Sequence, residues 1–519
     1  MKGSFANWRT GLFVAALCAV FVPSLQGKTY YISPNGSDAN SGTISAPWAT
    51  FRQAFSVAGP GDTVFVRGGE YPSEMVTDNA IAHGGAQGNY LVIKAFPGET
   101  PILNDFGRFQ LTKPYIRVEG LTFLGAGISA QATGCQVVGN TFSGPGFGIG
   151  AMHAFGNDLL FEGNTIDVIQ NTTLDHGLYV HEGDGITIRK NRFLRSFGYA
   201  IHIFGQNQQS TPKPLKNIVI EDNYISGSEQ RSGILTAFAA GQAFDLSDII
   251  IRNNIITGNG ASGISLRQGK NIKVYNNTIY ENQQSLTGSS IGPSIIVPSF
   301  SGSEDVSNVT ISNNLIVTTS GQVHVMVSSS GPNIVVDNNL YWPQGNGIEG
   351  TSDSRALFAD PMLVNPAALD FHLDANSPAV DAGLTLAMVT EDFDGTPRPQ
   401  GAAYDIGAFE FTLGPTSVED GEVSAPRSFE LLQNYPNPFN PSTQITFVVP
   451  QEGRVKLTIY NVLGQQIRTL FDQNVSVPGV QRVVWDGRDG SGQVVPSGLY
   501  FYRLESKNTA LSRRMILLK

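Results

Sequence analysis

Three of the seven histidines gather in residues 176–202: His176, His181 and His202, with Tyr179 between the first two. Imidazole and phenol groups are among the side chains that remove or supply protons during enzymatic reactions. This cluster is therefore the first candidate for chemistry. We predict catalytic roles for His176, Tyr179, His181 and His202.

The densest basic run of the chain lies close by and contains Arg189, Arg192 and Arg195. Arginine pairs with carboxylates through two parallel hydrogen bonds, so we predict that these residues and Arg267 bind an acidic substrate. On a uronate polymer, such a group would neutralise the carboxylate and acidify the C5 proton, which histidine or tyrosine would remove. The residue types therefore favour β-elimination or epimerisation.

Other interpretations of the same residues stay open. A glycoside hydrolase would use paired carboxylates, for example Asp175 with Glu182 or Asp184. A non-catalytic surface protein would need neither set, because an outward histidine can simply stack on its neighbours and a basic run can be a solvated face. The remaining histidines are interpreted as isolated and structural: His83, His153, His324 and His372. Zinc-type spacing of Cys and His is absent from the sequence, and the metal ligands, if any, are unknown.

The elements that position these side chains follow from a repeat. A hexapeptide of the form apolar-x-x-Asn-x-apolar recurs every 23 to 37 residues. Each unit is too short for a strand–helix–strand crossover, so it predicts one coil of a solenoid with parallel strands. Its asparagines are expected to form a hydrogen-bonded ladder from coil to coil. They are Asn140, Asn164, Asn191, Asn223, Asn254, Asn277, Asn314 and Asn339.

A second column sets the register of another strand. The steps taken as equivalent are Gly148-Ile149, Gly177-Leu178, Ala200-Ile201, Gly233-Ile234 and Gly263-Ile264. Because side chains alternate along a strand, Leu178, Val180, Ile201 and Ile203 are predicted to point inward. Tyr179, His181 and His202 then point outward, with Tyr179 beside His202 on the next coil. Arg267 is expected two coils further on, in the column of His181.

Composition bounds the partners and the compartment. The net charge of −10 argues against a nucleic-acid partner. Residues 1–27 read as a signal peptide with a basic start, an apolar stretch and a small-residue exit before Lys28, and no later transmembrane run is found. Cleavage there leaves Cys135 as the single cysteine, so no internal disulfide is expected.

The ends of the repeat carry motifs of a known group. Tyr30–Asp38, Pro47–Phe51 and Pro60–Tyr71 resemble the opening of secreted right-handed parallel β-helix proteins, and segments 377–383 and 394–409 resemble their closing part. The resemblance implies an all-β fold, a single-stranded, pectate-lyase-like solenoid over residues 28–411, with a capping helix within 47–58. Polysaccharide lyases and mannuronan epimerases share this fold, and because some need Ca²⁺, that ion is a candidate cofactor. Their calcium cluster and their Asp-Pro-His motif are not found, so no family residue is carried over.

The last part of the chain has a different pattern. After a linker at 412–428, residues 429–519 hold a Tyr435-Pro-Asn-Pro segment, a Trp485-Asp-Gly step and a Pro496-Ser-Gly-Leu-Tyr500 segment in order. This domain closely resembles the type A sorting domain of type IX secretion, which implies an Ig-like antiparallel β-sandwich, a Gram-negative host and contact with that machinery. An Ig-like carbohydrate-binding module is the alternative.

Together these features predict a secreted or cell-surface β-helix protein that acts on an extracellular polysaccharide. A lyase or C5-epimerase on a uronate polymer is the first interpretation, a glycoside hydrolase the second and a non-catalytic glycan-binding protein the third. The particular polysaccharide cannot be read from the residues.

Overall fold

The computed structural model describes residues 27–412 and 430–517 with short gaps. It leaves out 105–107, 145–149, 169–174, 206–213, 240–244, 284–291, 300–305, 320, 345–346, 432–433, 435–438, 440–441, 450–451, 463, 476–478 and 508. The predicted signal peptide therefore lies outside the described residues. Two compact units separate at Thr412 and Leu413.

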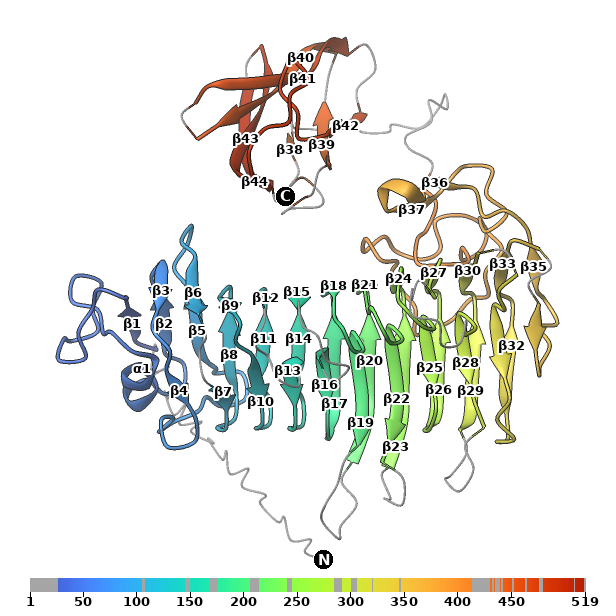
Figure 1. Cartoon of the computed structure of the whole chain (residues 1–519), viewed down its shortest axis with the longest axis horizontal. Helices are drawn as coiled ribbons and strands as arrows, with labels where there is room; N and C mark the ends of the chain where they lie inside the picture. Colours follow the sequence, from blue (N-terminus) through green and yellow to red (C-terminus); the bar gives the residue numbers. More distant parts are fainter. Residues whose placement is uncertain are drawn as a thin grey trace, which may run out of the picture. The chain divides into compact units, whose positions relative to one another are not determined.

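Unit 1 is a stack of coils in which each full coil adds one strand to each of three parallel sheets (Figure 1). Sheet 1 consists of β1 (Thr29–Ile32), β2 (Thr63–Val66), β5 (Leu91–Ala95), β8 (Ile116–Glu119), β11 (Gln136–Val138), β14 (Leu160–Glu162), β17 (Gly183–Arg189), β20 (Pro214–Glu221), β23 (Asp245–Arg252), β26 (Lys270–Tyr275), β29 (Ser307–Ser312) and β32 (Ile334–Asp337).

The second face of the stack is sheet 2. It consists of β4 (Met75–Val76), β7 (Arg108–Leu111), β10 (Ile128–Ala130), β13 (Gly150–Ala154), β16 (His176–Val180), β19 (Ile201–Gly205), β22 (Ile234–Phe238), β25 (Ile264–Leu266), β28 (Ile295–Val297), β31 (Val325–Val327) and β34 (Ile348–Glu349).

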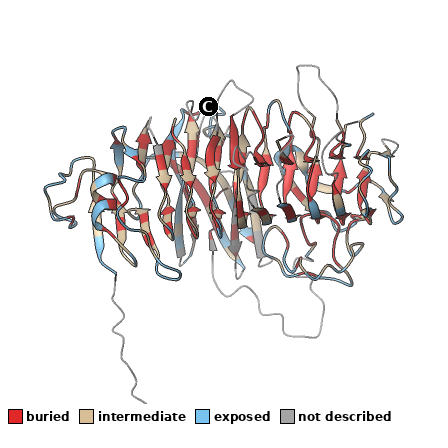
Figure 2. Ribbon diagram, turned by 90° about the horizontal axis from the view of Figure 1, so that it is seen from below, coloured by how far each residue is buried: buried red, intermediate tan, exposed pale blue. Residues whose placement is uncertain are grey.

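The third face is sheet 3. It consists of β3 (Gly69–Tyr71), β6 (Pro101–Asn104), β9 (Thr122–Leu124), β12 (Thr141–Gly144), β15 (Thr165–Val168), β18 (Arg192–Arg195), β21 (Tyr224–Ser226), β24 (Ile255–Thr257), β27 (Thr278–Tyr280), β30 (Leu315–Val317), β33 (Leu340–Trp342) and β35 (Leu357–Phe358). Aliphatic and aromatic side chains from all three sheets fill one continuous core along the stack, as a solenoid requires. Figure 2 shows the buried residues in red along the strands of the stack.

The asparagine ladder is confirmed. Each amide Nδ2 donates to the Oδ1 of the asparagine one coil on, at 2.9 to 3.2 Å. The ladder ends at Asp353, whose carboxylate accepts from Asn339 Nδ2 at 2.9 Å. These side chains are buried and hydrogen-bonded, which explains why the repeat keeps asparagine between sheets 1 and 3.

The register of sheet 2 agrees with the predicted alternation but not with its first member. Leu178 pairs with Met152 and with Ile201, so Ala151-Met152 is the step equivalent to Gly177-Leu178. Gly148-Ile149, which was assigned to this column, lies outside the described residues, and Met152 takes the equivalent place.

The two ends of the stack carry different additional segments. α1 (Phe51–Val57) lies within the predicted capping segment and buries Phe51, Ala54 and Phe55 in the core. At the far end β36 (Leu363–Asn365), η1 (Pro366–Ala368), β37 (Asp370–Leu373) and the loops up to Phe411 pack on the outer side of sheet 3. A fully buried pair, Arg398 with Glu410 at 2.6 Å, holds these loops together.

Unit 2 has two antiparallel sheets around a core that includes Trp485. Its strands are β38 (Glu430–Leu431), β39 (Thr443–Val449), β40 (Gly453–Asn461), β41 (Gln466–Val475), β42 (Gly479–Trp485), β43 (Gly498–Ser506) and β44 (Thr509–Leu517). This is the antiparallel arrangement predicted for an Ig-like domain. Within the described parts of both units, no helix has the length and apolarity needed to cross a membrane.

Candidate functional site

The predicted cluster lies on sheet 2, where β13, β16 and β19 are neighbours. Leu178 and Ile201 are fully buried in the core, so the residues that follow them face outward. Tyr179 and His202 pair in register, and their ring centroids lie 4.5 Å apart. Their predicted contact across neighbouring coils is confirmed.

A fourth histidine joins this row. His153 pairs with Tyr179 in register, and its Nδ1 lies 3.0 Å from Nε2 of His181. The expectation that His153 is isolated was therefore wrong. Extending the strand alternation back by one coil from Tyr179 is the signal that could have found it.

A second row runs beside the first and contains Phe155, His181 and Phe204. The ring of His181 stacks on Phe155 at 4.1 Å and on Tyr179 at 3.7 Å. His202 stacks on Phe204 at 5.0 Å. The sequence reasoning did not single out the two phenylalanines, although the same alternation places them in this row.

His176 reaches the cluster from the start of β16. Its ring lies 4.2 Å from that of His202, and its Nδ1 accepts a hydrogen bond from the backbone N–H of Tyr199 at 3.0 Å. In the neutral imidazole the proton is consequently on Nε2. Nε2 of His176 and Nδ1 of His202 are both buried without a hydrogen-bond partner in the described part of the chain. Buried polar atoms without a partner are destabilising in a folded protein.

The cluster is less open than the sequence suggested. His176, Tyr179 and His202 are only 1%, 4% and 8% exposed, although Tyr179 and His202 point outward from the sheet as predicted. The stacked rings cover one another, which removes most of their surface from water. A pocket of about 480 Å³ is lined by Phe155 of the second row and by Glu182, but by none of the four histidines and not by Tyr179.

Burial sets the protonation state of all four histidines. It is the largest cause that lowers the pKa of His153 to about 4, of His176 and His181 to about 3 and of His202 to about 2. Burial also raises the pKa of Tyr179 well above its ordinary value. At neutral pH the imidazoles are therefore unprotonated and the phenol keeps its proton.

Two arginines act on this cluster. After burial and the neighbouring histidines His176 and His181, the charges of Arg231 and Arg267 lower the pKa of His202 further. The guanidinium of Arg231 lies 5.9 Å from the ring centre of Tyr199, and Arg267 directly follows β25 on the same sheet. Continuing the strand register puts Arg267 in the column of His181 and two coils beyond His202, as predicted.

The basic run lies elsewhere. Arg189 ends β17 in sheet 1, and Arg192 and Arg195 begin and end β18 in sheet 3. Arg189 pairs with Glu162 at 3.1 Å and Arg195 with Asp167 at 2.8 Å. We expected the histidines and these arginines to share one site. This expectation was wrong, because the chain turns from sheet 2 through sheet 1 to sheet 3 between the two segments.

The other residues weighed earlier are also placed. His324 is buried, and its Nε2 lies 3.1 Å from the carbonyl oxygen of Trp342. His372 is not isolated, since it contacts Asp370 at 2.5 Å and Asp394 at 2.9 Å. Asp184 lies in β17 of sheet 1, away from the strand that carries the histidines.

A metal site would need several ligating side chains close together. Across the described ranges, no group of three or more His, Cys, Asp or Glu side chains is arranged to hold a metal ion. These residues do not fit a Ca²⁺ site, and the chemistry considered below uses none.

Fold and site together define a parallel β-helix protein with an imidazole and phenol cluster on one sheet. The model of the Pel9A-like right-handed beta helix region matches residues 30–291. The chain belongs to this family, and the predicted right-handed parallel β-helix is confirmed. A model of the FlgD Ig-like domain matches residues 441–510, in agreement with the antiparallel fold of unit 2.

Individual relatives are distant. The uncharacterized protein YwoF of Bacillus subtilis strain 168 is 24% identical over 448 residues, which cover 68% of this chain and 92% of that protein. Pectate lyase PEL9 of Emericella nidulans is 33% identical over 87 residues, 17% of this chain and 20% of the relative. The crystal structure of pectate lyase Pel9A is similar at 16% identity with a TM-score of 0.47, covering 75% of this chain and 97% of that one.

Proposed function

We propose that this protein acts on an acidic, uronate-containing polysaccharide by β-elimination or C5-epimerisation at sheet 2. The observation that carries the proposal is the contact of Tyr179 with His202, a neutral phenol against a neutral imidazole, with the charges of Arg231 and Arg267 acting on the same imidazole. Membership of the Pel9A-like family and the local similarity to a pectate lyase support it.

The chemistry follows from the protonation states. His202 is assigned as the base that takes the C5 proton of a uronate unit, and Arg267 as the group that stabilises the negative charge developing on its carboxylate. In elimination, the electron pair forms the C4–C5 double bond and expels the glycosidic oxygen, which takes a proton from the Tyr179 hydroxyl. In epimerisation, the anion is instead reprotonated at C5 from the opposite face.

The depressed pKa of His202 fits an anionic substrate. A free imidazole with a pKa of about 2 is a weak base. A uronate carboxylate that approaches Arg231 and Arg267 would offset their charges and bring a negative charge close to the ring, which raises the pKa. The base then gains strength when substrate is present, and a neutral sugar would not produce this change.

A panel of polysaccharides tests the reaction class. The full chain is incubated with polygalacturonate, alginate and a glycosaminoglycan, with and without a chelator, while absorbance at about 235 nm reports unsaturated uronate. In parallel, uptake of deuterium at C5 from heavy water reports epimerisation. We expect one of these signals on at least one polymer. New reducing ends without absorbance, or binding without turnover on every polymer, would refute the proposal.

We also propose that residues 1–27 and 429–519 direct export through type IX secretion. The ordered motifs of the last segment support this, together with its Ig-like match and its antiparallel sheets around Trp485. Expression in a Gram-negative host with this machinery tests it: the full chain is expected at the cell surface or in the medium, and a chain ending at residue 411 in the periplasm. Equal export of both chains would contradict the proposal.

A further inference from the structure

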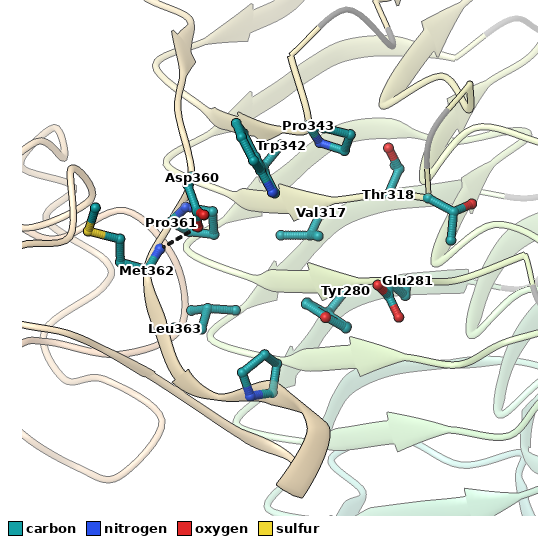
Figure 3. Close-up of a pocket in the computed structure, with 12 residues that line it drawn as sticks. Tyr280, Glu281, Val317, Thr318, Trp342, Pro343, Asp360, Pro361, Met362 and Leu363 are labelled. Carbon is teal, nitrogen blue, oxygen red and sulfur yellow. Dashed lines mark hydrogen bonds between the residues drawn. The ribbon is translucent and has the colours of Figure 1, made fainter.

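A second pocket lies on another face of unit 1, between sheet 3 and the loops that follow β35. Its volume is about 540 Å³, within the range of small-molecule sites. Figure 3 shows Trp342, Val317 and Tyr280 one after another on one side and Asp360 to Leu363 on the facing segment. No residue of this pocket belongs to the histidine cluster.

The register of sheet 3 makes this pocket a slot. Tyr280 pairs with Val317, and Val317 pairs with Trp342, so the two aromatic residues stand two strand spacings apart, about 10 Å. Val317 between them is buried, whereas Tyr280 and Trp342 are only partly buried, so part of each aromatic residue remains accessible from the pocket, although the Tyr280 ring also packs on Phe371 at 5.2 Å. All three side chains come from rigid neighbouring strands, which means that the slot exists before a ligand binds.

The charge of the pocket restricts its ligand. Glu281 and Asp360 contribute carboxylates, and no Lys, Arg or His is among the described residues that line it. One Asp360 oxygen already accepts from the backbone N–H of Met362 at 2.9 Å, and the side chain is exposed, so this carboxylate does not need a cationic partner. It can still accept hydrogen bonds from hydroxyl groups, whereas a uronate would be repelled.

From these observations we infer that the slot binds an uncharged pyranose unit of a polysaccharide. The C–H face of such a ring packs on the electron-rich faces of Trp342 and Tyr280, and its hydroxyls donate to Glu281 and Asp360. The site lies on a different sheet from the proposed catalytic cluster and does not depend on the reaction proposed there. It would hold the protein on neutral portions of a mixed polysaccharide.

Tryptophan fluorescence and titration calorimetry test the slot on the full chain. Xylohexaose, mannohexaose and cellohexaose are titrated as neutral probes, with trigalacturonate as the anionic one. We expect at least one neutral probe to bind in a way that depends on Trp342, whereas any binding of trigalacturonate, which is also the ligand proposed for sheet 2, should not depend on Trp342. Trp342→Ala should lower the affinity for the neutral probe by about tenfold, because it removes one stacking face, and Trp342→Phe should restore most of it.

Two controls separate this inference from the proposed reaction. His202→Ala should leave neutral-sugar binding unchanged even where it abolishes elimination, and Trp342→Ala should leave turnover of a short oligouronate unchanged. Thermal unfolding of each variant checks that the stack is intact. Absence of binding by all neutral probes, binding of trigalacturonate that Trp342→Ala abolishes, or unchanged affinity for the neutral probe in a folded Trp342→Ala protein would each overturn the inference.

Discussion

Two polar columns run along the same stack and are built by the same geometry, yet they differ in how their polar atoms are satisfied. In the asparagine ladder each amide donates to the next coil and to backbone carbonyls; Asn191, for example, bonds to Asn223 and to the carbonyl oxygens of Phe161 and Arg189. In the histidine cluster of sheet 2, Nε2 of His176 and Nδ1 of His202 are buried without a partner in the described residues.

The difference separates structure from function. A buried polar group that is fully hydrogen-bonded rigidifies the fold, whereas one left unpaired lowers its stability and needs another explanation. Ring stacking alone does not account for these histidines, because the residue that pairs with His202 on the next coil is Leu235, which has no ring. The comparison therefore assigns the asparagines to the fold, and the unpaired nitrogens agree with the ligand-binding role proposed for the histidines.

Replacing His202 tests this assignment with the largest expected effect. His202→Ala removes the proposed base and should lower turnover of the uronate substrate by about 10²- to 10⁴-fold. The free energy of urea unfolding should fall by about 1–3 kcal/mol, because truncating the buried ring leaves a cavity and removes its stacking contacts, so turnover is measured per folded molecule.

The exposed His83 provides the matched control, since His83→Ala should change neither turnover nor stability. A His202→Ala protein that is strongly destabilised and loses activity only in proportion to its unfolded fraction would show that both columns are structural.

The ladder should respond in the opposite way. Asn191→Asp removes the Nδ2 donor that serves two carbonyl oxygens and places a carboxylate against Asn223, so we expect a loss of about 3 kcal/mol or more in the free energy of unfolding. Turnover per folded molecule should be unchanged. Chemical denaturation followed by circular dichroism, with activity measured at low temperature, checks both parts.

The same substitution at Asn308 is the control. Asn308 lies in an exposed amide row and donates to Asn271 at 3.2 Å, so Asn308→Asp should change stability by less than about 1 kcal/mol. The chain itself accepts a carboxylate in the ladder at Asp353, its last rung, where the side chain only has to accept. Equal losses at positions 191 and 308 would contradict the role given to burial.

Lowering the pH should reveal the burial of the histidines, because their protonation is coupled to unfolding. The folded-state pKa of His202 is about 2 and that of His176 about 3, below the ordinary value of about 6.5. Between these values the unfolded chain binds more protons, so stability is unaffected above about pH 6.5 and falls by about 1.4 kcal/mol per pH unit and histidine as the pH drops. His202→Leu should flatten this slope in urea unfolding from pH 7 to pH 4.

His372 gives an internal contrast of opposite sign. Burial alone would lower its pKa, but the hydrogen bonds to Asp370 and Asp394 outweigh it and raise the pKa to about 9. Its contribution is complete below about pH 6.5 and is lost as the pH rises towards 9, so His372→Gln should affect the neutral range and leave the acid slope alone. An acid slope unchanged in His202→Leu would contradict burial of a neutral ring.

The fold was readable from the sequence because it repeats. Asn140 to Asn339 recur in one hexapeptide, and a column that recurs eight times fixes strand, turn and register at once. The alternation also placed Tyr179 beside His202. It missed His153 because a single histidine in a strand gives no chemical signal until its neighbours one coil away are known.

The predictions that failed depend on where the chain turns from one sheet to the next. Arg189 and Arg195 are close in sequence to His181, but the lengths of the turns decide that they face from sheets 1 and 3, and turn length does not reveal direction. Burial of Tyr179 was missed for a related reason. Ring stacking between coils is a property of three-dimensional packing that no single strand displays.

Substituting Arg267 and Arg195 tests the comparison further and has the smallest expected effect. Arg267→Gln removes a charge that acts on His202 and a donor for the substrate carboxylate, so the affinity for trigalacturonate should fall by about tenfold. Arg195→Gln removes only a half-exposed partner of Asp167 and should change the affinity by less than about twofold. Titration calorimetry at two salt concentrations measures both, and only the interaction with Arg267 should weaken with added salt. If Arg195→Gln weakened binding and Arg267→Gln did not, the substrate would lie on sheet 3, and the unpaired nitrogens of sheet 2 would require a different ligand.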